Sequence, residues 1–203
     1  MENIIYIFDI FGTSVFAISG ALVAGKKQMD IFGVVVLACT TAIGGGTLRD
    51  IILGNYPVFW VKDTVYLFVA FTLAILTFLF AHRWKYKINI LLYSDAIGLA
   101  VFTIIGFQKG FMATQNYTIS IVMGIFTGVV GGIFRDILSG EIPMILRKEI
   151  YASASFIGSL VMVILTYFSL PNNFIFFIGI FTILAIRFSA IKWKLSLPLF
   201  KIK

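Results

Sequence analysis

Long apolar runs, separated by short polar segments, limit most strongly what this chain can fold into. A helix needs about 20 mainly apolar residues to cross the hydrocarbon core of a bilayer. Hydrophobic residues make up 60% of the 203 residues, charged residues only 12%, and the mean hydropathy is +1.03. This composition leaves too little polar surface for a soluble enzyme. The sequence therefore predicts an integral membrane protein.

Seven of these runs are candidates for membrane-spanning helices. They do not alternate between polar and apolar residues, as the strands of a membrane β-barrel would. Pro171 and the two asparagines after it divide the last apolar stretch into two helices. The expected spans are 3–24, 31–53, 64–81, 88–108, 118–139, 150–169 and 174–190. The predicted fold class is all-α, with seven transmembrane helices.

Basic residues are distributed unevenly between the loops. If the spans alternate in direction, most of the 16 Lys and Arg residues fall on one side, and Lys62 and Lys109 fall on the other. Cytoplasmic loops carry the excess of basic residues, which places the N-terminus outside and the C-terminus in the cytoplasm. The net charge of +7 is then explained by anchors that meet anionic lipid headgroups rather than by nucleic acid. The basic residues on the side predicted to be cytoplasmic are Lys26, Lys27, Arg83, Lys85, Lys87, Arg147, Lys148, Arg187, Lys192, Lys194, Lys201 and Lys203.

The chain has one cysteine, Cys39, and one histidine, His82. A single thiol cannot form an intramolecular disulfide, and no Cys/His spacing matches a metal site. Nothing resembles a catalytic triad, a nucleotide-binding loop or a pair of catalytic carboxylates. We therefore expect neither an enzyme nor a protein with a resident cofactor.

The sequence also matches itself when it is shifted by 86 residues, so that position 9 aligns with position 95. In this alignment, which needs no gap, glycine, proline and charged residues of the two copies fall on one another. Each repeat contains three spans, so the second copy enters the membrane from the opposite face, as in secondary transporters built from inverted repeats. We predict a first repeat over 3–85, an inverted second repeat over 88–170, and a seventh helix with a basic cytoplasmic tail over 173–203. Matching positions include Asp9 and Asp95, Gly12 and Gly98, Gly20 and Gly106, Arg49 and Arg135, Asp50 and Asp136, Gly54 and Gly140, and Pro57 and Pro143.

Charged residues inside the spans are the costly exceptions, at about 2.5–3.5 kcal/mol each near the bilayer centre. These residues are Asp9, Arg49, Asp50, Asp95, Arg135 and Asp136. Their depths predict an ion pair between Asp9 and Arg49, and the repeat predicts a second between Asp95 and Arg135. Arg49 and Asp50 are neighbours and should point to different helix faces, so that one forms a bridge while the other faces a cavity. Ion pairs that only lock the fold are an equally good interpretation.

Glycine clusters precede both Arg-Asp pairs. They are Gly44, Gly45 and Gly46 in the second span, and Gly131 and Gly132 in the fifth. Each glycine weakens a helix by about 1 kcal/mol relative to alanine, so the clusters predict a break or kink. Broken backbone at membrane depth is tolerated where it lines water, and its free carbonyls can coordinate a cation. The alternative is close helix packing.

These motifs resemble those of a known family. Gly-Gly-Gly-Thr-Leu-Arg-Asp at 44–50, with Gly54 and Pro57, forms one half of the pattern. Gly-Gly-Ile-Phe-Arg-Asp at 131–136, followed by Gly-Glu-Ile-Pro at 140–143, forms the other. Over residues 5–190 the chain is similar to prokaryotic members of the trimeric intracellular cation channel (TRIC) family, whose bacterial domain is also labelled a putative glycine transporter.

The resemblance implies a homotrimer with a pore inside each protomer that passes monovalent cations, chiefly potassium. The pore would run past the kinked second and fifth helices, beside Arg49, Asp50, Arg135 and Asp136. The lysine pattern that binds lipid in the animal channels is not evident before the glycines, where Ala42 and Ile43 stand. A potassium channel is therefore the leading hypothesis. A transporter of glycine or another small amino acid is the second, and a scaffold without flux the third.

Overall fold

The structure is a computed structural model that describes residues 2–81 and 89–198. His82 and the basic residues Arg83, Lys85, Lys87, Lys201 and Lys203 lie outside the described residues. Within these ranges the secondary-structure elements are helices, and one isolated antiparallel bridge joins Glu149 to Ser196. The elements are α1 (Glu2–Lys26), α2 (Ile31–Ile52), α3 (Phe59–Lys62), α4 (Val65–Phe80), α5 (Asn89–Thr114), α6 (Tyr117–Leu138), η2 (Met144–Leu146), α7 (Ala152–Tyr167) and α8 (Asn172–Trp193).

Five helices (α1, α2, α5, α6 and α8) are long and apolar enough to cross a membrane. The apolar helices α4 and α7 have 16 residues each and are shorter than that requirement. The predicted division at Pro171 is confirmed, because α7 ends at Tyr167 and Pro171 caps the start of α8. The predicted end of the fourth span at residue 108 is wrong, because α5 continues to Thr114.

Local signals in the sequence explain where the central helices begin and end. The carboxylate of Asp30 accepts a hydrogen bond from Gly33 N (2.7 Å) at the start of α2. The side-chain amide oxygen of Asn116 accepts a hydrogen bond from Thr118 N (2.9 Å) at the start of α6. Gly54 and Gly140 follow the two helices with φ of 69° and 72°, a left-handed conformation that favours glycine. The 86-residue offset therefore relates equivalent helix ends.

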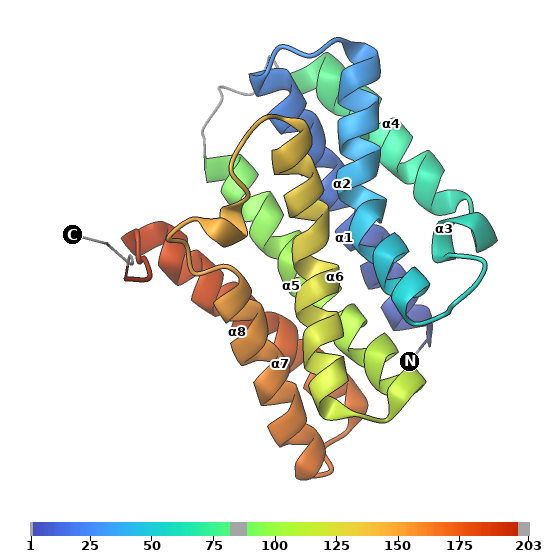
Figure 1. Ribbon diagram of the computed structural model, residues 1–203, viewed down its shortest axis with the longest axis vertical. Helices are drawn as coiled ribbons and strands as arrows, with labels where there is room; N and C mark the ends of the chain where they lie inside the picture. Colours follow the sequence, from blue (N-terminus) through green and yellow to red (C-terminus); the bar gives the residue numbers. More distant parts are fainter. Residues whose placement is uncertain (1, 82–88, 199–203) are drawn as a thin grey trace.

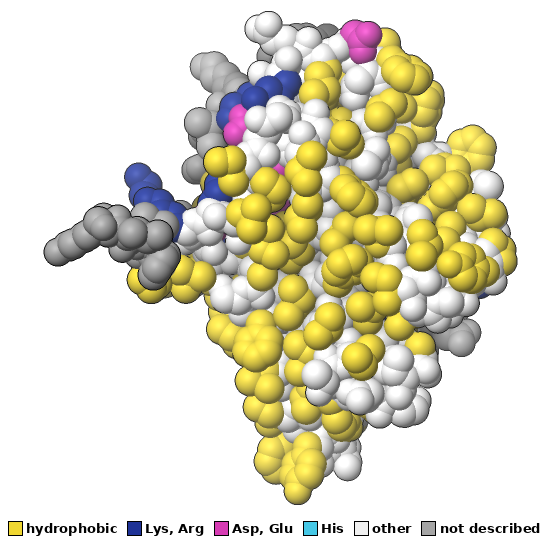
Figure 2. All heavy atoms as spheres, viewed as in Figure 1, with side chains coloured by type: hydrophobic (Ala, Val, Ile, Leu, Met, Phe, Trp, Pro, Cys, Tyr) yellow, Lys and Arg dark blue, Asp and Glu magenta, His cyan; other side chains and the backbone are white. Residues whose placement is uncertain are grey.

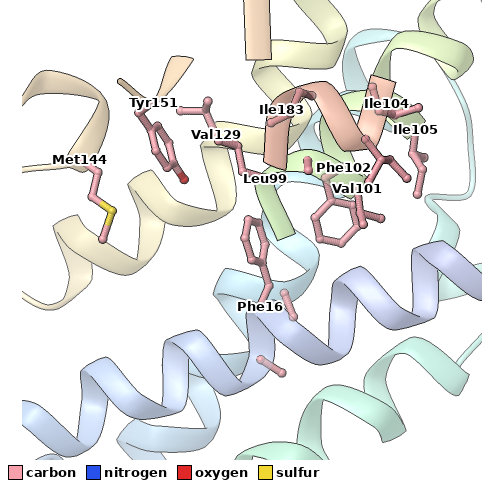
Figure 3. Close-up of a cluster of buried hydrophobic side chains, with 14 of the residues drawn as sticks. Phe16, Leu99, Val101, Phe102, Ile104, Ile105, Val129, Met144, Tyr151 and Ile183 are labelled. Atoms are coloured by element: carbon pink, nitrogen blue, oxygen red, sulfur yellow. The ribbon is translucent and has the colours of Figure 1, made fainter. Parts of the chain in front are cut away.

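Four helices, α1, α2, α5 and α6, pack against one another at the centre of the bundle. Figure 1 shows α4 on one side of this group and α7 with α8 on the other, with successive long helices running in alternate directions. The apolar core runs through the bundle, with buried residues from α1, α2, α4, α5, α6, α7 and α8. Between α1 and α5 the rings of Phe16 and Phe102 are 5.1 Å apart between centroids (Figure 3).

Large apolar side chains also cover much of the outside of the bundle (Figure 2). The exposed fraction is 72% for Phe32 on α2, 69% for Phe68 on α4 and 72% for Phe181 on α8. Contiguous apolar surface of this kind is unfavourable in water and stable against lipid tails. The chain is therefore a multi-pass membrane protein.

Candidate ion pathway

The charges at the end of α2 form a closed local cluster. Arg49 donates through Nε to Asp50 Oδ1 (2.9 Å), and its Nη2 lies 2.8 Å from the same oxygen. The other carboxylate oxygen, Oδ2, accepts a hydrogen bond from Phe59 N (2.9 Å) at the start of α3. Asp50 thus holds the loop after α2 against the helix that precedes it.

The end of α6 repeats this arrangement. Arg135 Nε donates to Asp136 Oδ1 (2.9 Å), and Met144 N, at the start of η2, donates to Asp136 Oδ2 (2.9 Å). The expectation that Arg49 and Asp50 point to different faces is wrong, because the two side chains bond each other, and Arg135 and Asp136 do the same. The arginine side chain is long enough to fold back onto the carboxylate that follows it.

The predicted ion pair between Asp95 and Arg135 is confirmed. Arg135 Nη1 lies 2.5 Å from Asp95 Oδ1 and also donates to Ser19 Oγ (2.7 Å). The three side chains join α5, α6 and α1 and have no exposed surface. The sequence did not predict the contact between Ser19 and Arg135.

The predicted ion pair between Asp9 and Arg49 is wrong. Asp9 Oδ2 instead lies 3.6 Å from Lys109 Nζ on α5 and accepts a hydrogen bond from Tyr66 Oη (3.2 Å) on α4. The guanidinium of Arg49 is held by Asp50 and lies over the ring of Phe59, 5.6 Å from its centroid. A carboxylate and a cation still meet at this depth, but the cation comes from another helix.

Lys109 is the functional candidate that sequence reasoning placed incorrectly, in a loop beyond the fourth span. The segment from Gly106 to Thr114 contains no proline and includes the apolar residues Phe107, Phe111 and Met112. These features favour continuation of the helix and could have placed Lys109 inside it.

The glycine clusters pack helices together and do not interrupt them. The backbone remains helical through Gly44, Gly45 and Gly46 in α2 and through Gly131 and Gly132 in α6. The expected break, with its free carbonyls, is therefore wrong.

The two helices cross where a side chain would not fit. A Cβ atom added to Gly45 would collide with the carbonyl oxygen of Thr127 on α6, and one added to Gly131 would collide with that of Thr41 on α2. Absence of a side chain lets the two backbones touch directly. The remaining glycines of the clusters face side chains: Gly44 faces Phe134, Gly46 faces Phe59, and Gly132 faces the Tyr151 hydroxyl.

An open cavity of about 410 Å³, which we call the vestibule, lies at the end of the bundle where α2 and α5 finish. Its wall includes two members of the charge network, Asp50 and Lys109, together with the exposed Lys62 and Asn55. The vestibule is lined by Asp50, Asn55, Phe59, Lys62, Lys109, Met112 and Ala113.

The charged side chains of both clusters, including Asp50 in the vestibule wall, are almost completely buried. Asp9 and Asp50 are 2% and 3% exposed, Asp136 is 4% exposed, and Arg49, Asp95 and Arg135 are not exposed. Both charge clusters are therefore buried, and the contact between α2 and α6 lies between them.

Several buried polar atoms within this network lack a hydrogen-bond partner among the described residues. They include Asp95 Oδ2, Arg135 Nη2 and the hydroxyl of Tyr151. Buried polar atoms in native proteins almost always find a partner in protein or water. The carboxylate of Asp95 thus retains lone pairs that can accept from water or coordinate a cation.

Together, the fold and this network define a multi-pass helical membrane protein with charge clusters on both sides of a glycine-mediated helix crossing. A family model described as "Glycine transporter" matches residues 6–82 and 92–167. The inner membrane protein YadS of Escherichia coli K12, of the UPF0126 group, is 49% identical over 202 residues and covers 97% of this chain and 96% of its own. A UPF0126 membrane protein of Vibrio cholerae is 49% identical over 199 residues, with coverage of 98% and 83%.

Solved structures identify the same family by its channel name. A TRIC trimeric intracellular cation channel orthologue from Rhodobacter sphaeroides superimposes with a TM-score of 0.91 at 39% identity, covering 95% of this chain and 99% of its own. A prokaryotic TRIC channel crystallised in 0.5 M KCl gives a TM-score of 0.89 at 33% identity, covering 97% and 100%. The chain belongs to the prokaryotic TRIC family, whose sequence model carries the glycine-transporter description.

Proposed function

We propose that the protein is a monovalent-cation channel that conducts potassium through a path inside each protomer of a homotrimer. The observation that carries this proposal is the pair of buried charge clusters, one on each side of the Gly45 and Gly131 crossing. Charges in a membrane interior are rarely retained without a wet path or cavity to serve. The similarity to solved TRIC channels at 33–39% identity supports the same function.

The vestibule would supply the entrance for the cation. Asp50 borders it, and Asp9 lies directly behind Lys109, so two carboxylates can attract a cation toward the network. Asp95 and Asp136 would take the equivalent role at the other end. Carboxylates in a pore concentrate cations and replace part of their hydration shell.

The path would open by separation of α2 and α6 at their crossing. The contact at Gly45 and Gly131 is between backbones, and the ring of Phe134 on α6, which packs on Gly44 of α2, would move with this separation. The arginines would hold their own helix ends together during this movement, because each is bonded to the aspartate that follows it.

The proposed path requires two inverted repeats over 3–85 and 88–170, with 173–203 as the additional helix and tail. Equivalent Arg-Asp bonds and equivalent glycine helix ends at the 86-residue offset support this relation. The alternating helix directions in Figure 1 support seven crossings, with the 16-residue helices α4 and α7 among them. Such short helices are accommodated by local thinning of the bilayer.

The proposed orientation has the N-terminus and the vestibule outside the cell and the C-terminus in the cytoplasm. The loops on the side of the membrane opposite the vestibule carry the excess of basic residues, which supports this orientation. Those residues would contact anionic lipids of the plasma membrane. No resident cofactor is part of the proposal, and potassium is the permeant ion.

The test is reconstitution of the purified protein in planar bilayers with unequal potassium chloride on the two sides. We expect unitary currents whose reversal potential follows the potassium gradient and is unchanged when glutamate replaces chloride. Saturable glycine uptake into proteoliposomes without unitary currents would instead support the transporter. Absence of both activities from correctly folded protein would support the scaffold and overturn the proposal.

The location of the path can be tested separately with cysteine chemistry. In a Cys39→Ser background, Asn55→Cys places a thiol in the vestibule wall, whereas Val61→Cys places one on nearby exposed surface. A cationic thiol reagent added from outside should reduce the current of the first variant and leave that of the second unchanged. Inhibition from the cytoplasmic side alone would reverse the proposed orientation.

A further inference from the structure

A second cavity, of about 300 Å³, lies at the end of α8, away from the vestibule. Its wall is formed by the start of α5, the end of α8, the segment before α7 and the residues that follow α8. Figure 1 shows these segments side by side near the C-terminal end of the described chain. We call this cavity the α8 pocket; none of the residues in its wall belongs to the charge network described above.

Arg187 is the central polar side chain of the α8 pocket. It is 1% exposed, yet only Nη1 makes a hydrogen bond, to the carbonyl oxygen of Ile150 (2.7 Å). Nε and Nη2 are buried and make no hydrogen bond with the described residues. The nearest carboxylate oxygen, Glu149 Oε2, is 3.6 Å from Nη2. The guanidinium is fixed against the ring of Tyr151, 4.9 Å from its centroid, so its unused donors are held in place.

The charge around Arg187 is unbalanced. Two further basic residues, Lys148 and Lys194, line the α8 pocket, and Glu149 is the acidic residue in the wall. Both lysines are exposed and can swing toward a ligand. The pocket therefore attracts an anion and has donors available to bind it.

The walls of the α8 pocket are built by specific contacts. Lys194 ends α8 in a left-handed conformation (φ 52°), which turns the chain back toward the segment before α7. Leu197 N then donates to the carbonyl oxygen of Lys148 (2.8 Å), and Ser196 pairs with Glu149. Leu92 and Ile191 provide an apolar wall beside these polar groups.

We propose that the α8 pocket binds a phosphate group, carried by an anionic lipid headgroup or by a free phosphate compound. The planar fork of an arginine matches two phosphate oxygens, and the fixed Nε and Nη2 of Arg187 form such a fork. Lys148 and Lys194 bind the remaining oxygens as mobile point charges. Glu149 is part-exposed and only loosely paired, so it can turn aside as the phosphate enters.

The experiment measures binding to the full-length protein in neutral detergent by isothermal titration calorimetry. Inorganic phosphate is titrated in one arm and dihexanoyl phosphatidic acid in the other. We expect saturation at one site per chain. Comparable affinities in the two arms identify a site for the phosphate group alone, and at least about tenfold tighter binding of the lipid identifies a headgroup site.

Three variants make the test specific. Lys148→Gln and Lys194→Gln each remove one charged hydrogen bond and should weaken binding about tenfold. Lys192→Gln is the matched control, because Lys192 is exposed on the same helix, lies near the ring of Trp193 and does not line the pocket. Arg187→Lys keeps the positive charge but removes the two parallel donors of the guanidinium, and it should weaken binding more than either lysine variant. The proposal is overturned if neither ligand saturates, or if Lys192→Gln weakens binding as much as the two pocket variants.

Discussion

Arg135 on α6 and Asp95 on α5 form an ion pair in which neither side chain has exposed surface. Arg135 also donates to Asp136, so Arg135→Gln leaves two buried carboxylates without their cation, whereas Asp95→Asn leaves the guanidinium with one carboxylate partner. Breaking a buried ion pair typically costs about 3–5 kcal/mol. We therefore expect Arg135→Gln to lower the free energy of unfolding by roughly this amount, and Asp95→Asn to lower it by less. Thermal unfolding in detergent, followed by tryptophan fluorescence, measures the change.

The double variant tests whether the two residues act as a unit. Because the two side chains contact each other directly, each substitution already removes their shared interaction, and the double variant should be more stable than the sum of the single effects predicts, by about 0.5–3 kcal/mol. Simple additivity would contradict a direct pair. Lys62→Gln, on the exposed vestibule rim, is the control and should leave the unfolding temperature unchanged.

The crossing of α2 and α6 depends on the absence of side chains. Gly45→Ala and Gly131→Ala each place a methyl group against a backbone carbonyl that cannot turn away. We expect each variant to lose about 1–3 kcal/mol of stability, the usual cost of overpacking. The unfolding temperature in detergent measures this loss.

Gly25 provides the matched control for these two variants. It lies in α1, and an added Cβ would meet nothing within 4 Å. Gly25→Ala should therefore be neutral or slightly stabilising, because alanine is the better helix former. Equal destabilisation by all three substitutions would contradict the claim that the contact between α2 and α6 requires glycine at positions 45 and 131.

The vestibule contains basic residues that repel an entering cation. Lys62 is exposed on its wall and makes no ion pair among the described residues. If the vestibule is the entrance, Lys62→Gln should increase the cation conductance, by about 1.5- to 2-fold in ~0.01 M salt, where the Debye length is about 30 Å.

The increase should disappear near 1 M salt, where the Debye length falls to about 3 Å. Single-channel recording across a salt series measures both limits. Lys26→Gln, an exposed charge far from the vestibule, is the control. A conductance change that persists at high salt would point to altered structure instead of an electrostatic effect.

An exposed ion-pair cluster joins the loop after α1 to the loop after α6, and it predicts an acid-sensitive contact. Lys27 Nζ lies 2.6 Å from Glu141 Oε1, and Arg147 Nη2 lies 3.0 Å from Glu141 Oε2. The hydrogen bond and the charge of Lys27, followed by those of Arg147, lower the pKa of Glu141 from its ordinary value of 4.5. The stabilising effect of the ionised group is therefore fully present above pH 4.5 and is lost as the pH falls through the lowered pKa.

Glu141→Gln isolates this effect. The native protein should unfold at a slightly higher temperature than the variant at neutral pH, and the difference should vanish in acid. Because the cluster is exposed, the difference should also shrink at high salt. A difference that grows as the pH falls below 4.5 would have the wrong sign for this pair.

The sequence predicted the positions of the helices better than it predicted the partners of the buried charges. The apolar runs indicated the helices, because a chain in lipid must satisfy its backbone hydrogen bonds within each span. Depth along the helices paired Asp9 with Arg49 incorrectly, yet the pair between Asp95 and Arg135, which the 86-residue offset predicted from it, is correct. Depth along a helix follows from the rise per residue, whereas the choice of partner depends on which neighbouring helix presents a closer charge.

The sequence by itself determined the membrane environment, the approximate helices and the duplicated glycine and Arg-Asp motifs, because these depend on composition and local spacing. Only the tertiary structure decided that Lys109 meets Asp9, that each arginine bonds the aspartate beside it, and that the glycines bring α2 and α6 into contact without breaking either helix. Those outcomes depend on how side chains from distant parts of the chain compete for the same space, and spacing along one chain does not contain that information.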